Sequence, residues 1–301
     1  MSDAPPAQGT AIRRVGIVAK PGISEAADEI AAITAWLEAR QVQAVIEGRT
    51  AALAGLAPGG HPSRDELPAS VDLVVVLGGD GSLLGMADRI AQAGFDIPIL
   101  GVNFGTLGFL TEITLPDLFP ALEATLAGTV TIESRMMLRA RVERDGAEIS
   151  DRTVLNDVAV TGGSLSRIVE FWVWVGEEFV ARLNADGIVV ATPTGSTAYN
   201  LSAGGPIVHP EVGAIVLNPI APHTLTNRPI VIPASSAVRV QPLLKREGDE
   251  AFVTFDGQRG DRLASRDVVQ IRRAPRPMRL VRASTLGYYE VLRQKLKWTE
   301  R

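Results

Sequence analysis

The chain contains no cysteine, so it can form neither disulfide bridges nor thiolate metal sites. It also has no apolar run long enough to cross a membrane, and residues 1–14 lack the apolar core of a signal peptide. The formal net charge of -4 argues against broad binding to nucleic acids or to anionic membranes. We therefore expect a cytoplasmic protein whose partners include neither nucleic acid nor membrane.

Lysine is scarce, although arginine is plentiful. The only lysines are Lys20, Lys245, Lys295 and Lys297. No Gly-x-x-x-x-Gly-Lys-Ser/Thr motif occurs, which excludes the phosphate loop of the common nucleoside triphosphatases. The dinucleotide fingerprint Gly-x-Gly-x-x-Gly does not follow the first expected strand either. Any nucleotide must therefore be bound by another design.

The 301 residues predict two kinds of domain. Residues 1–11 are rich in alanine and proline, and we expect a disordered N-terminal segment. Residues 12–127 alternate strand and helix patterns, which predicts an α/β domain with a mostly parallel sheet. Residues 128–286 hold short β-rich segments between turn residues, which predicts an all-β, sandwich-like domain. Residues 287–301 are expected to form a C-terminal helix that returns to the α/β domain.

The most informative segment is Gly78-Gly79-Asp80-Gly81, between an expected strand at 71–76 and an expected helix at 82–93. This places Asp80 at the carboxyl end of a sheet, where α/β folds bind ligands. Gly79 and Gly81 lack side chains, so phosphates can approach the backbone N–H groups and the helix N-terminus. A carboxylate repels phosphate, so Asp80 is expected to hold a metal, grip a sugar hydroxyl or take a proton. The alternative is a plain strand-to-helix turn in which Asp80 caps the helix.

A second turn at the same sheet edge is Asn103-Phe104-Gly105-Thr106-Leu107-Gly108-Phe109-Leu110. Phe109 could form the wall of a flat apolar slot for a base, or it could be a core residue. Further along, Asn156 and Asp157 interrupt an apolar strand, where a buried carboxylate needs partners. Asn156 matches an adenine edge or an amide, and Asp157 can accept a ribose diol. The alternative is a strand-end turn with side-chain hydrogen bonds.

The longest candidate segment runs from Asn184 to Asn200. An expected strand leads into the hydroxyl-rich turn Thr192-Pro193-Thr194-Gly195-Ser196-Thr197, which opens a short helix. Hydroxyl and backbone N–H groups would converge there, small residues leave room, and Tyr199 can flank a base. This pattern predicts a ligand site more than a structural turn.

Together these segments closely resemble the NAD kinase family over nearly the whole chain. The matching segments are Gly78–Gly81, Asn103–Leu110, Asn156-Asp157, Asp186–Asn200, Asp256-Gly257-Gln258 and Tyr289–Arg293. The Gly-Gly-Asp-Gly loop alone also suits phosphofructokinases and diacylglycerol kinases. The resemblance implies an N-terminal Rossmann-like domain, a C-terminal β-rich domain, a catalytic cleft between them, and a homodimer or homotetramer.

The family transfers the γ-phosphoryl group of ATP to the 2′-hydroxyl of the adenosine ribose of NAD. The resemblance implies that Asp80 accepts the hydroxyl proton, and that ATP comes with a divalent metal, Mg²⁺ or Mn²⁺. It implies an NAD site lined by Phe109, Asn156, Asp157, Thr194, Thr197, Ala198 and Tyr199. Asp186 would contact the nicotinamide end near Asn184, and a neighbouring subunit would contribute near Ala221.

Two positions depart from the family pattern. Relatives often carry Glu where this chain has Asp157, and an arginine where it has Asn184. These departures leave the choice between NAD and NADH open and motivate an alternative, a non-catalytic NAD/NADP-binding sensor. A lipid or sugar kinase and polyphosphate as donor are further alternatives. The scattered histidines, His61, His209 and His223, predict no metal site in the protein.

Overall fold

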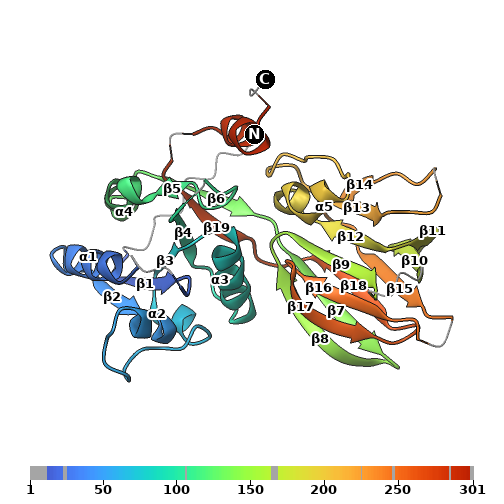
Figure 1. Cartoon of the computed structure of the whole chain (residues 1–301), viewed down its shortest axis with the longest axis horizontal. Helices are drawn as coiled ribbons and strands as arrows, with labels where there is room; N and C mark the ends of the chain where they lie inside the picture. Colours follow the sequence, from blue (N-terminus) through green and yellow to red (C-terminus); the bar gives the residue numbers. More distant parts are fainter. Residues whose placement is uncertain are drawn as a thin grey trace. The chain divides into compact units, whose positions relative to one another are not determined.

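The computed structural model describes residues 12–22, 26–105, 107–163, 169–224, 226–245, 248–284 and 286–298. The expected disordered segment at residues 1–11 lies outside this description. The chain divides into two compact units (Figure 1). The first unit comprises Met1–Glu133 and Arg279–Arg301, and the second unit comprises Ser134–Met278.

The first unit is built around a seven-stranded sheet with the order β2-β1-β3-β4-β19-β6, in which β5 also pairs with β4. The pairings β1–β2, β1–β3, β3–β4, β4–β5 and β4–β19 are parallel. The strands are β1 (Arg14–Ala19), β2 (Gln43–Ile46), β3 (Leu73–Leu77), β4 (Pro98–Asn103), β5 (Ile113–Thr114), β6 (Thr131–Arg135) and β19 (Met278–Arg282). The helices are α1 (Ala26–Glu38), α2 (Gly48–Leu53), α3 (Asp80–Gln92), α4 (Leu118–Leu126) and α6 (Tyr288–Leu296), with short 3₁₀ turns η1 (Leu67–Ser70) and η2 (Leu115–Asp117).

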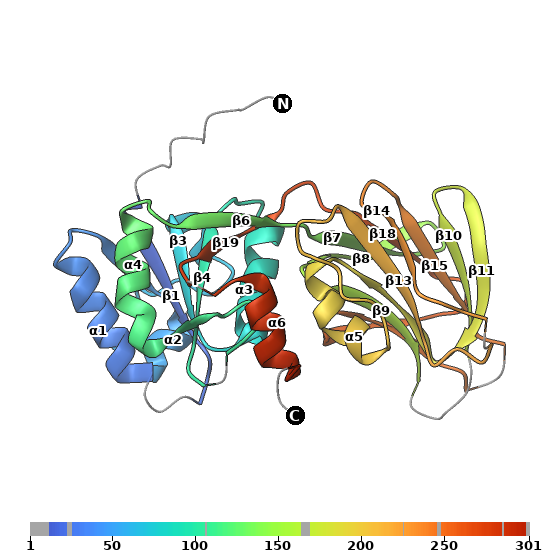
Figure 2. The ribbon, with the colours of Figure 1, turned by 90° about the horizontal axis from the view of Figure 1, so that it is seen from above.

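Helices flank both faces of this sheet, which explains its continuous apolar strands (Figure 2). All five residues of β3 are buried. Helices α1 and α4 share one core cluster with Leu100 and Val102 of β4. Gly101, between those two residues, points the other way, where a Cβ would lie 2.8 Å from Leu83 of α3. The sheet therefore presents the ends of β1, β3 and β4 between two helical layers.

The unit boundaries differ from the expected 127/128 and 286/287. The residues of β6 and β19 fall inside the expected β-rich domain, but no strand was predicted for either segment, and both strands join the sheet of the first unit. Local pattern does not show which sheet a short strand enters.

The second unit is a sandwich of two six-stranded antiparallel sheets. One has the order β11-β10-β15-β18-β7-β8 and the other β14-β13-β12-β9-β16-β17. One core cluster, including Phe171 of β10 and Val190 of β12, joins their inner faces.

The strands of the first sheet are β7 (Leu138–Arg144), β8 (Ala147–Val154), β10 (Val169–Val175), β11 (Glu178–Ala185), β15 (Val238–Leu243) and β18 (Val268–Arg273). Those of the second are β9 (Asp157–Gly162), β12 (Gly187–Ala191), β13 (Ala214–Ile220), β14 (Ile230–Pro233), β16 (Ala251–Phe255) and β17 (Gln258–Leu263). The 3₁₀ turn η3 (Thr194–Thr197) and helix α5 (Tyr199–Ser202) follow β12.

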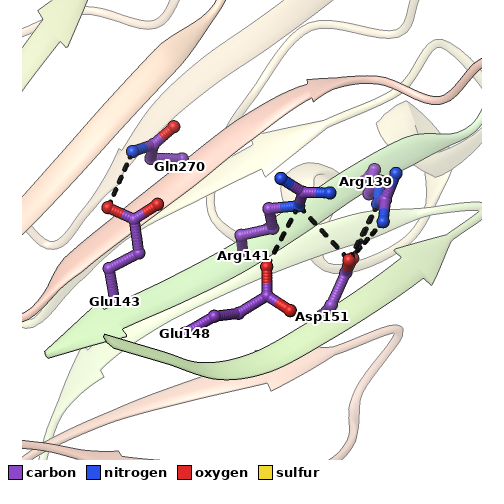
Figure 3. Close-up of polar contacts among 6 residues, drawn as sticks. All are labelled: Arg139, Arg141, Glu143, Glu148, Asp151 and Gln270. Carbon is purple, nitrogen blue, oxygen red and sulfur yellow. Dashed lines mark hydrogen bonds and ion pairs between the residues drawn. The ribbon is translucent and has the colours of Figure 1, made fainter. Parts of the chain in front are cut away.

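The outer face of the first sheet is polar. Leu138, Ala140 and Val142 of β7 are buried, whereas the residues between them point outward. Figure 3 shows Arg139 and Arg141 reaching Asp151 of β8, with Nε–Oδ distances of 2.7 and 3.2 Å. This alternation fixes the strand register, because a shift by one residue would bury the charges.

Among the helices of the described ranges, none combines the length and the apolar character that a membrane crossing requires.

Candidate active site

Asp80 opens helix α3 directly after the turn that ends β3. Gly79 is the N-cap residue, and no side chain caps the helix. Asp80 instead directs its carboxylate across to the loop after β4. The alternative in which Asp80 caps its own helix is therefore wrong.

The Asp80 carboxylate holds that loop through four hydrogen bonds. Asp80 Oδ2 accepts from the Phe109 amide at 2.9 Å. Oδ1 accepts from the amides of Leu110 at 3.1 Å and Thr111 at 3.0 Å, and from Thr111 Oγ1 at 2.9 Å. Three consecutive amides and one hydroxyl thus fix the position and orientation of this carboxylate.

Gly108 is required for this arrangement. A Cβ on Gly108 would lie 2.1 Å from Asp80 Oδ1 and 2.3 Å from Thr111 Oγ1, so no other residue fits without displacing the carboxylate. Asn103 supports the same turn, because its Nδ2 donates to Thr111 Oγ1 at 3.2 Å and its Oδ1 accepts from the Gly105 amide at 2.8 Å. The two loops expected at one sheet edge are joined through Asp80.

Gly79 and Gly81 have no such internal reason to be glycine. A Cβ added to either residue would meet nothing within 4 Å. Gly81 lies inside helix α3, where a glycine costs about 1 kcal/mol relative to alanine, whereas glycine is well tolerated at the N-cap position of Gly79. Open space over both glycines at a helix N-terminus is consistent with a ligand that approaches the backbone closely.

Lys20 is a residue that the sequence reasoning noted but did not place. It follows β1 and lies beside the glycine turn, since a Cβ on Gly78 would come within 3.0 Å of the Lys20 Cβ. Its side chain is exposed, and its amide donates to the Leu77 carbonyl at 2.8 Å. Its position directly after the first strand of a parallel sheet was the sequence signal that could have placed Lys20 at this site.

Phe109 is half-buried. The ammonium group of Lys295 on α6 lies over its ring in a cation–π contact, with Nζ 5.7 Å from the ring centroid. The C-terminal helix therefore contributes a charge next to the loop that Asp80 holds.

In the second unit, Asn156 and Asp157 lie where β8 ends and β9 begins. The expected single strand over 154–160 is interrupted there, and the break is held by a residue 100 positions away. Asp256 Oδ2 accepts from the Leu155 amide at 2.9 Å, and Oδ1 accepts from the amides of Asn156 at 2.7 Å and Asp157 at 3.0 Å. The strand-end turn of the alternative is present, but a distant carboxylate makes its hydrogen bonds.

Asp157 is 2% exposed, and its pKa is strongly perturbed. Burial, followed by the negative charge of Asp256, raises the pKa of Asp157 from 3.8 to about 7. A hydrogen bond from the Tyr199 amide partly opposes this rise in pKa. Asp157 therefore changes charge near neutral pH, which is unusual for an aspartate.

The hydroxyl-rich turn packs against the backbone of Asn156. Thr192 Oγ1 donates to the Leu155 carbonyl at 2.6 Å and accepts from the Gly195 amide at 2.9 Å. The Thr192 amide donates to the Asn156 carbonyl at 2.8 Å. A Cβ on Gly195 would lie 2.0 Å from that carbonyl oxygen, so only glycine allows the contact.

Several hydroxyl groups of this segment are used internally. Ser196 Oγ donates to the Pro193 carbonyl at 2.6 Å, and Thr197 Oγ1 donates to the Thr194 carbonyl at 3.2 Å. Thr194 is buried, Ala198 is half-buried, and Tyr199 is 42% exposed. Tyr199 thus remains accessible, and its backbone amide is bonded to Asp157.

The remaining predicted residues lie at the other end of β12. Asp157 pairs with Ala191 at one end, whereas Gly187 pairs with Ile220 at the other. The Asp186 amide donates to the Ile220 carbonyl, next to Ala221, and the His223 amide donates to the Asn184 carbonyl. Six residues of extended chain separate Asp186 from Thr192, about 20 Å at 3.3 Å per residue. The structure therefore brings the second-unit residues together as two clusters.

Within the described ranges, no group of three or more histidine or acidic side chains could hold a metal ion.

Two family models match the chain. The ATP-NAD kinase N-terminal domain matches residues 15–130, and the ATP-NAD kinase C-terminal domain matches residues 155–283. The two matches cover the glycine turn with Asp80 and the whole Asn156–Asp256 cluster.

Curated relatives are similar over most of their length. The chain is 46% identical to an NAD kinase of Geotalea daltonii over 88% of this chain and 92% of the relative. It is 45% identical to an NAD kinase of Geobacter sulfurreducens over 96% of this chain and the full length of the relative.

Two solved structures share the fold. A yeast NADH kinase complexed with NADH superposes with a TM-score of 0.87 at 24% identity, covering 97% of this chain and 89% of the other. An NAD kinase from Archaeoglobus fulgidus in complex with ATP gives 0.73 at 24% identity, covering 94% and 98%. The expected fold class, an α/β domain followed by a β-rich domain, is confirmed.

Proposed function

This chain belongs to the ATP-NAD kinase family, and we propose that it is an NAD kinase, which transfers the γ-phosphoryl group of ATP to the 2′-hydroxyl of the adenosine ribose of NAD. The presence of both family domains in one chain carries the proposal. In the reaction the ribose oxygen forms a bond to the γ-phosphorus, the bond from that phosphorus to the β–γ bridging oxygen breaks, and NADP and ADP are released.

Asp80 is the proposed base for the hydroxyl proton. Its Oδ2 accepts one hydrogen bond from protein, from the Phe109 amide, and a carboxylate oxygen offers two lone-pair positions. The second position can receive the proton of the ribose hydroxyl as the phosphoryl group arrives. The four donors around Asp80 hold the carboxylate in one orientation, which favours proton transfer along a fixed direction.

The triphosphate of ATP is proposed to lie over the glycine turn. The open space at Gly79 and Gly81 supports this, because the first amides of α3 have no helical partners. Lys20 supplies a positive charge beside the turn. Polyphosphate could use the same donors, since they recognise phosphate rather than adenosine.

The chain shows no protein-made metal centre among the residues described, and Asp80 is already held by four donors. Mg²⁺, or Mn²⁺ in its place, is proposed to enter bound to the triphosphate, where it neutralises phosphate charge.

The cluster around Asp157 is proposed to bind NAD. Ionised Asp157 can accept both hydroxyls of a ribose diol, and Asn156 offers a donor and an acceptor to a base edge or an amide. The exposed Tyr199 ring can flank the base, and Phe109, Thr194, Thr197 and Ala198 complete the proposed set.

Asn184, Asp186 and Ala221 are proposed to act at the nicotinamide end. They lie at the far end of β12 from Asp157. If these three residues and the Asp157 cluster all contact one small group, a neighbouring copy of the chain must bring its own Asn184, Asp186 and Ala221 to a shared site. We propose a homodimer or homotetramer, and separately a cytoplasmic location. Light scattering on the purified protein would test the assembly, and a monomer would contradict it.

A coupled assay tests the activity. NAD, ATP and Mg²⁺ are supplied, and NADP is detected with an NADP-dependent glucose-6-phosphate dehydrogenase. A parallel run replaces ATP by polyphosphate, and in a run with NADH the NADPH is detected directly, because the dehydrogenase does not consume it. The variant Asp80→Asn should lower kcat by about two to four decades, the usual contribution of a general base, while NAD binding persists. Near-normal turnover would reject the role of Asp80.

The alternative function, an NAD/NADP sensor, is motivated by Asp157 and Asn184. It predicts saturable binding of NAD without NADP formation in the same assay.

A further inference from the structure

We propose that Asp256 is a positioning residue that fixes the backbone of Asn156 and Asp157 and, through its charge, controls the ionisation of Asp157 toward the dinucleotide. This inference rests on the proposed function for its ligand, but its central measurement needs no ligand. Asp256 belongs to the segment Asp256-Gly257-Gln258, for which the proposed reaction has so far supplied no role.

The position of Asp256 is set by a tight hairpin. Asp256 and Gly257 form the two-residue loop between β16 and β17, with φ values of 51° and 68°. Positive φ at both loop residues is the type I′ turn, which favours Asn-Gly and Asp-Gly. The Asp256 amide also donates to the Asp157 carbonyl at 3.0 Å. The turn and the start of β9 are therefore locked together.

The hydrogen bonds of Asp256 explain the positioning role. Its carboxylate accepts from three consecutive amides, at Leu155, Asn156 and Asp157. Amides at a strand break would otherwise be unpaired and cost about 1–3 kcal/mol each when buried. The strand interruption that places Asn156 and Asp157 at this point therefore depends on a carboxylate or a similar acceptor at position 256.

The charge of Asp256 explains its control over the ionisation of Asp157. Burial and then Asp256 raise the pKa of Asp157 to about 7, opposed by the Tyr199 amide. The neighbouring strands β12 and β16, with the sequences GIVVA and AFVTF, carry no ionisable side chain. Within β9 (DVAVTG), Asp157 is the only one.

The other ionisable side chains that the structure describes on β17 and α5 are Asp261, Arg262 and Tyr199. On β17, Asp261 and Arg262 pair with Val253 and Phe252, away from the turn. On α5 the ionisable group is the Tyr199 phenol, whose ring is 42% exposed. Among the described side chains of these elements, Asp256 is the charged group that raises the pKa of Asp157.

The functional consequence concerns pH. A ribose diol donates two hydrogen bonds to an ionised carboxylate, whereas a protonated carboxyl loses charge and one acceptor. With the pKa of Asp157 at about 7, NAD must displace a proton to bind below neutral pH. Binding should weaken about tenfold for each pH unit well below that pKa.

The test is the titration of Asp157 in the full-length protein by ¹³C NMR of aspartate carboxyl groups, with the signal assigned by its loss in Asp157→Asn. In Asp256→Asn the charge is removed but one acceptor oxygen remains, and Asn-Gly suits the same turn. The Asp157 midpoint should fall in this variant. The matched control Asp261→Asn removes a charge from the same hairpin and should leave the midpoint in place.

Kinetics provide the second readout. Between pH 8 and pH 6 the KM for NAD of the wild type should rise about tenfold, and that of Asp256→Asn should rise less, with kcat less affected. If Asp256→Asn does not fold, Asp256→Gly retains a loop suited to positive φ and is also uncharged.

An unchanged Asp157 midpoint in every folded charge-free variant would overturn the inference. Absence of NADP formation by the wild type would instead reject the proposed function, while the NMR titration would still decide the inference.

Discussion

Thr111 Oγ1 donates a hydrogen bond of 2.9 Å to Asp80 Oδ1, across 31 positions of sequence. Thr111 is fully buried and its hydroxyl also accepts from Asn103 Nδ2 at 3.2 Å. The hydroxyl therefore connects the end of β4 to the carboxylate proposed as the base.

Replacing Thr111 by valine keeps the shape of the side chain and removes this hydroxyl. We expect a loss of about 1–3 kcal/mol in stability, because Asn103 and Asp80 each lose a partner. We expect kcat to fall by about three- to tenfold as the carboxylate gains freedom. Thermal unfolding and the coupled assay measure the two effects. Thr111→Ser keeps the hydroxyl and should behave like the wild type in kcat; equal losses in both variants would mean that packing, not the hydrogen bond, matters.

Replacing Gly108 by alanine should displace Asp80. The new Cβ would lie 2.1 Å from Oδ1, far inside van der Waals contact. We expect a fall in kcat of about two decades or more, similar to that of Asp80→Asn. The control is Gly105→Ala in the same loop, where the nearest atom to a Cβ is 3.9 Å away. If Gly108→Ala kept full activity, the fixed carboxylate would be irrelevant to turnover.

Replacing Gly81 by alanine should separate stability from function. Nothing lies within 4 Å of the added Cβ, and alanine favours the helix by up to about 1 kcal/mol, so Tm should rise. The KM for ATP should rise as well, because the methyl group occupies the space proposed for phosphate. Gly213→Ala, also in open space, should leave the KM unchanged. A more stable Gly81→Ala enzyme with an unaltered KM would place the phosphate elsewhere.

The pKa of Asp157 predicts a pH dependence of stability. The folded pKa of about 7 lies above the ordinary aspartate value of 3.8, so between these pH values the folded state binds more protons than the unfolded state. Stability contributed by this group is therefore complete at low pH and falls as pH rises toward 7, by about 2–4 kcal/mol in total. Urea unfolding of the wild type and Asp157→Asn from pH 4 to 8 should show a difference that changes in this direction. A difference that is constant with pH would disprove the raised pKa.

The sequence predicted the strand, glycine turn and helix around Asp80 because β-branched and helical periodicities are local properties. It also predicted that this turn and the one containing Phe109 share a sheet edge, which follows from parallel topology. It could not predict that Asp80 binds the amides of residues 109–111, since a hydrogen bond between distant residues leaves no periodic pattern.

The same limit applies to the second unit. Asp256 was part of a matching motif, but its contact with Asn156 and Asp157 depends on the pairing of β9 with β16. Antiparallel edge strands such as β8 and β11 were missed because their mostly exposed residues show little apolar alternation. Asp186 and Asp157 lie apart because β12 runs from Gly187, the residue after Asp186, to Ala191, the residue that pairs with Asp157. The sequence does predict this strand.

The sheet order β4-β19-β6 has a consequence for synthesis. Strand β19 begins at Met278, so the ribosome must make the whole second unit before the strand that lies between β4 and β6 exists. A nascent chain that ends at Arg135 would leave β4 without β19 and β6 without its neighbour in the sheet. The second unit is an uninterrupted segment and can fold first, whereas the first unit is completed only when the C-terminal part of the chain returns to it.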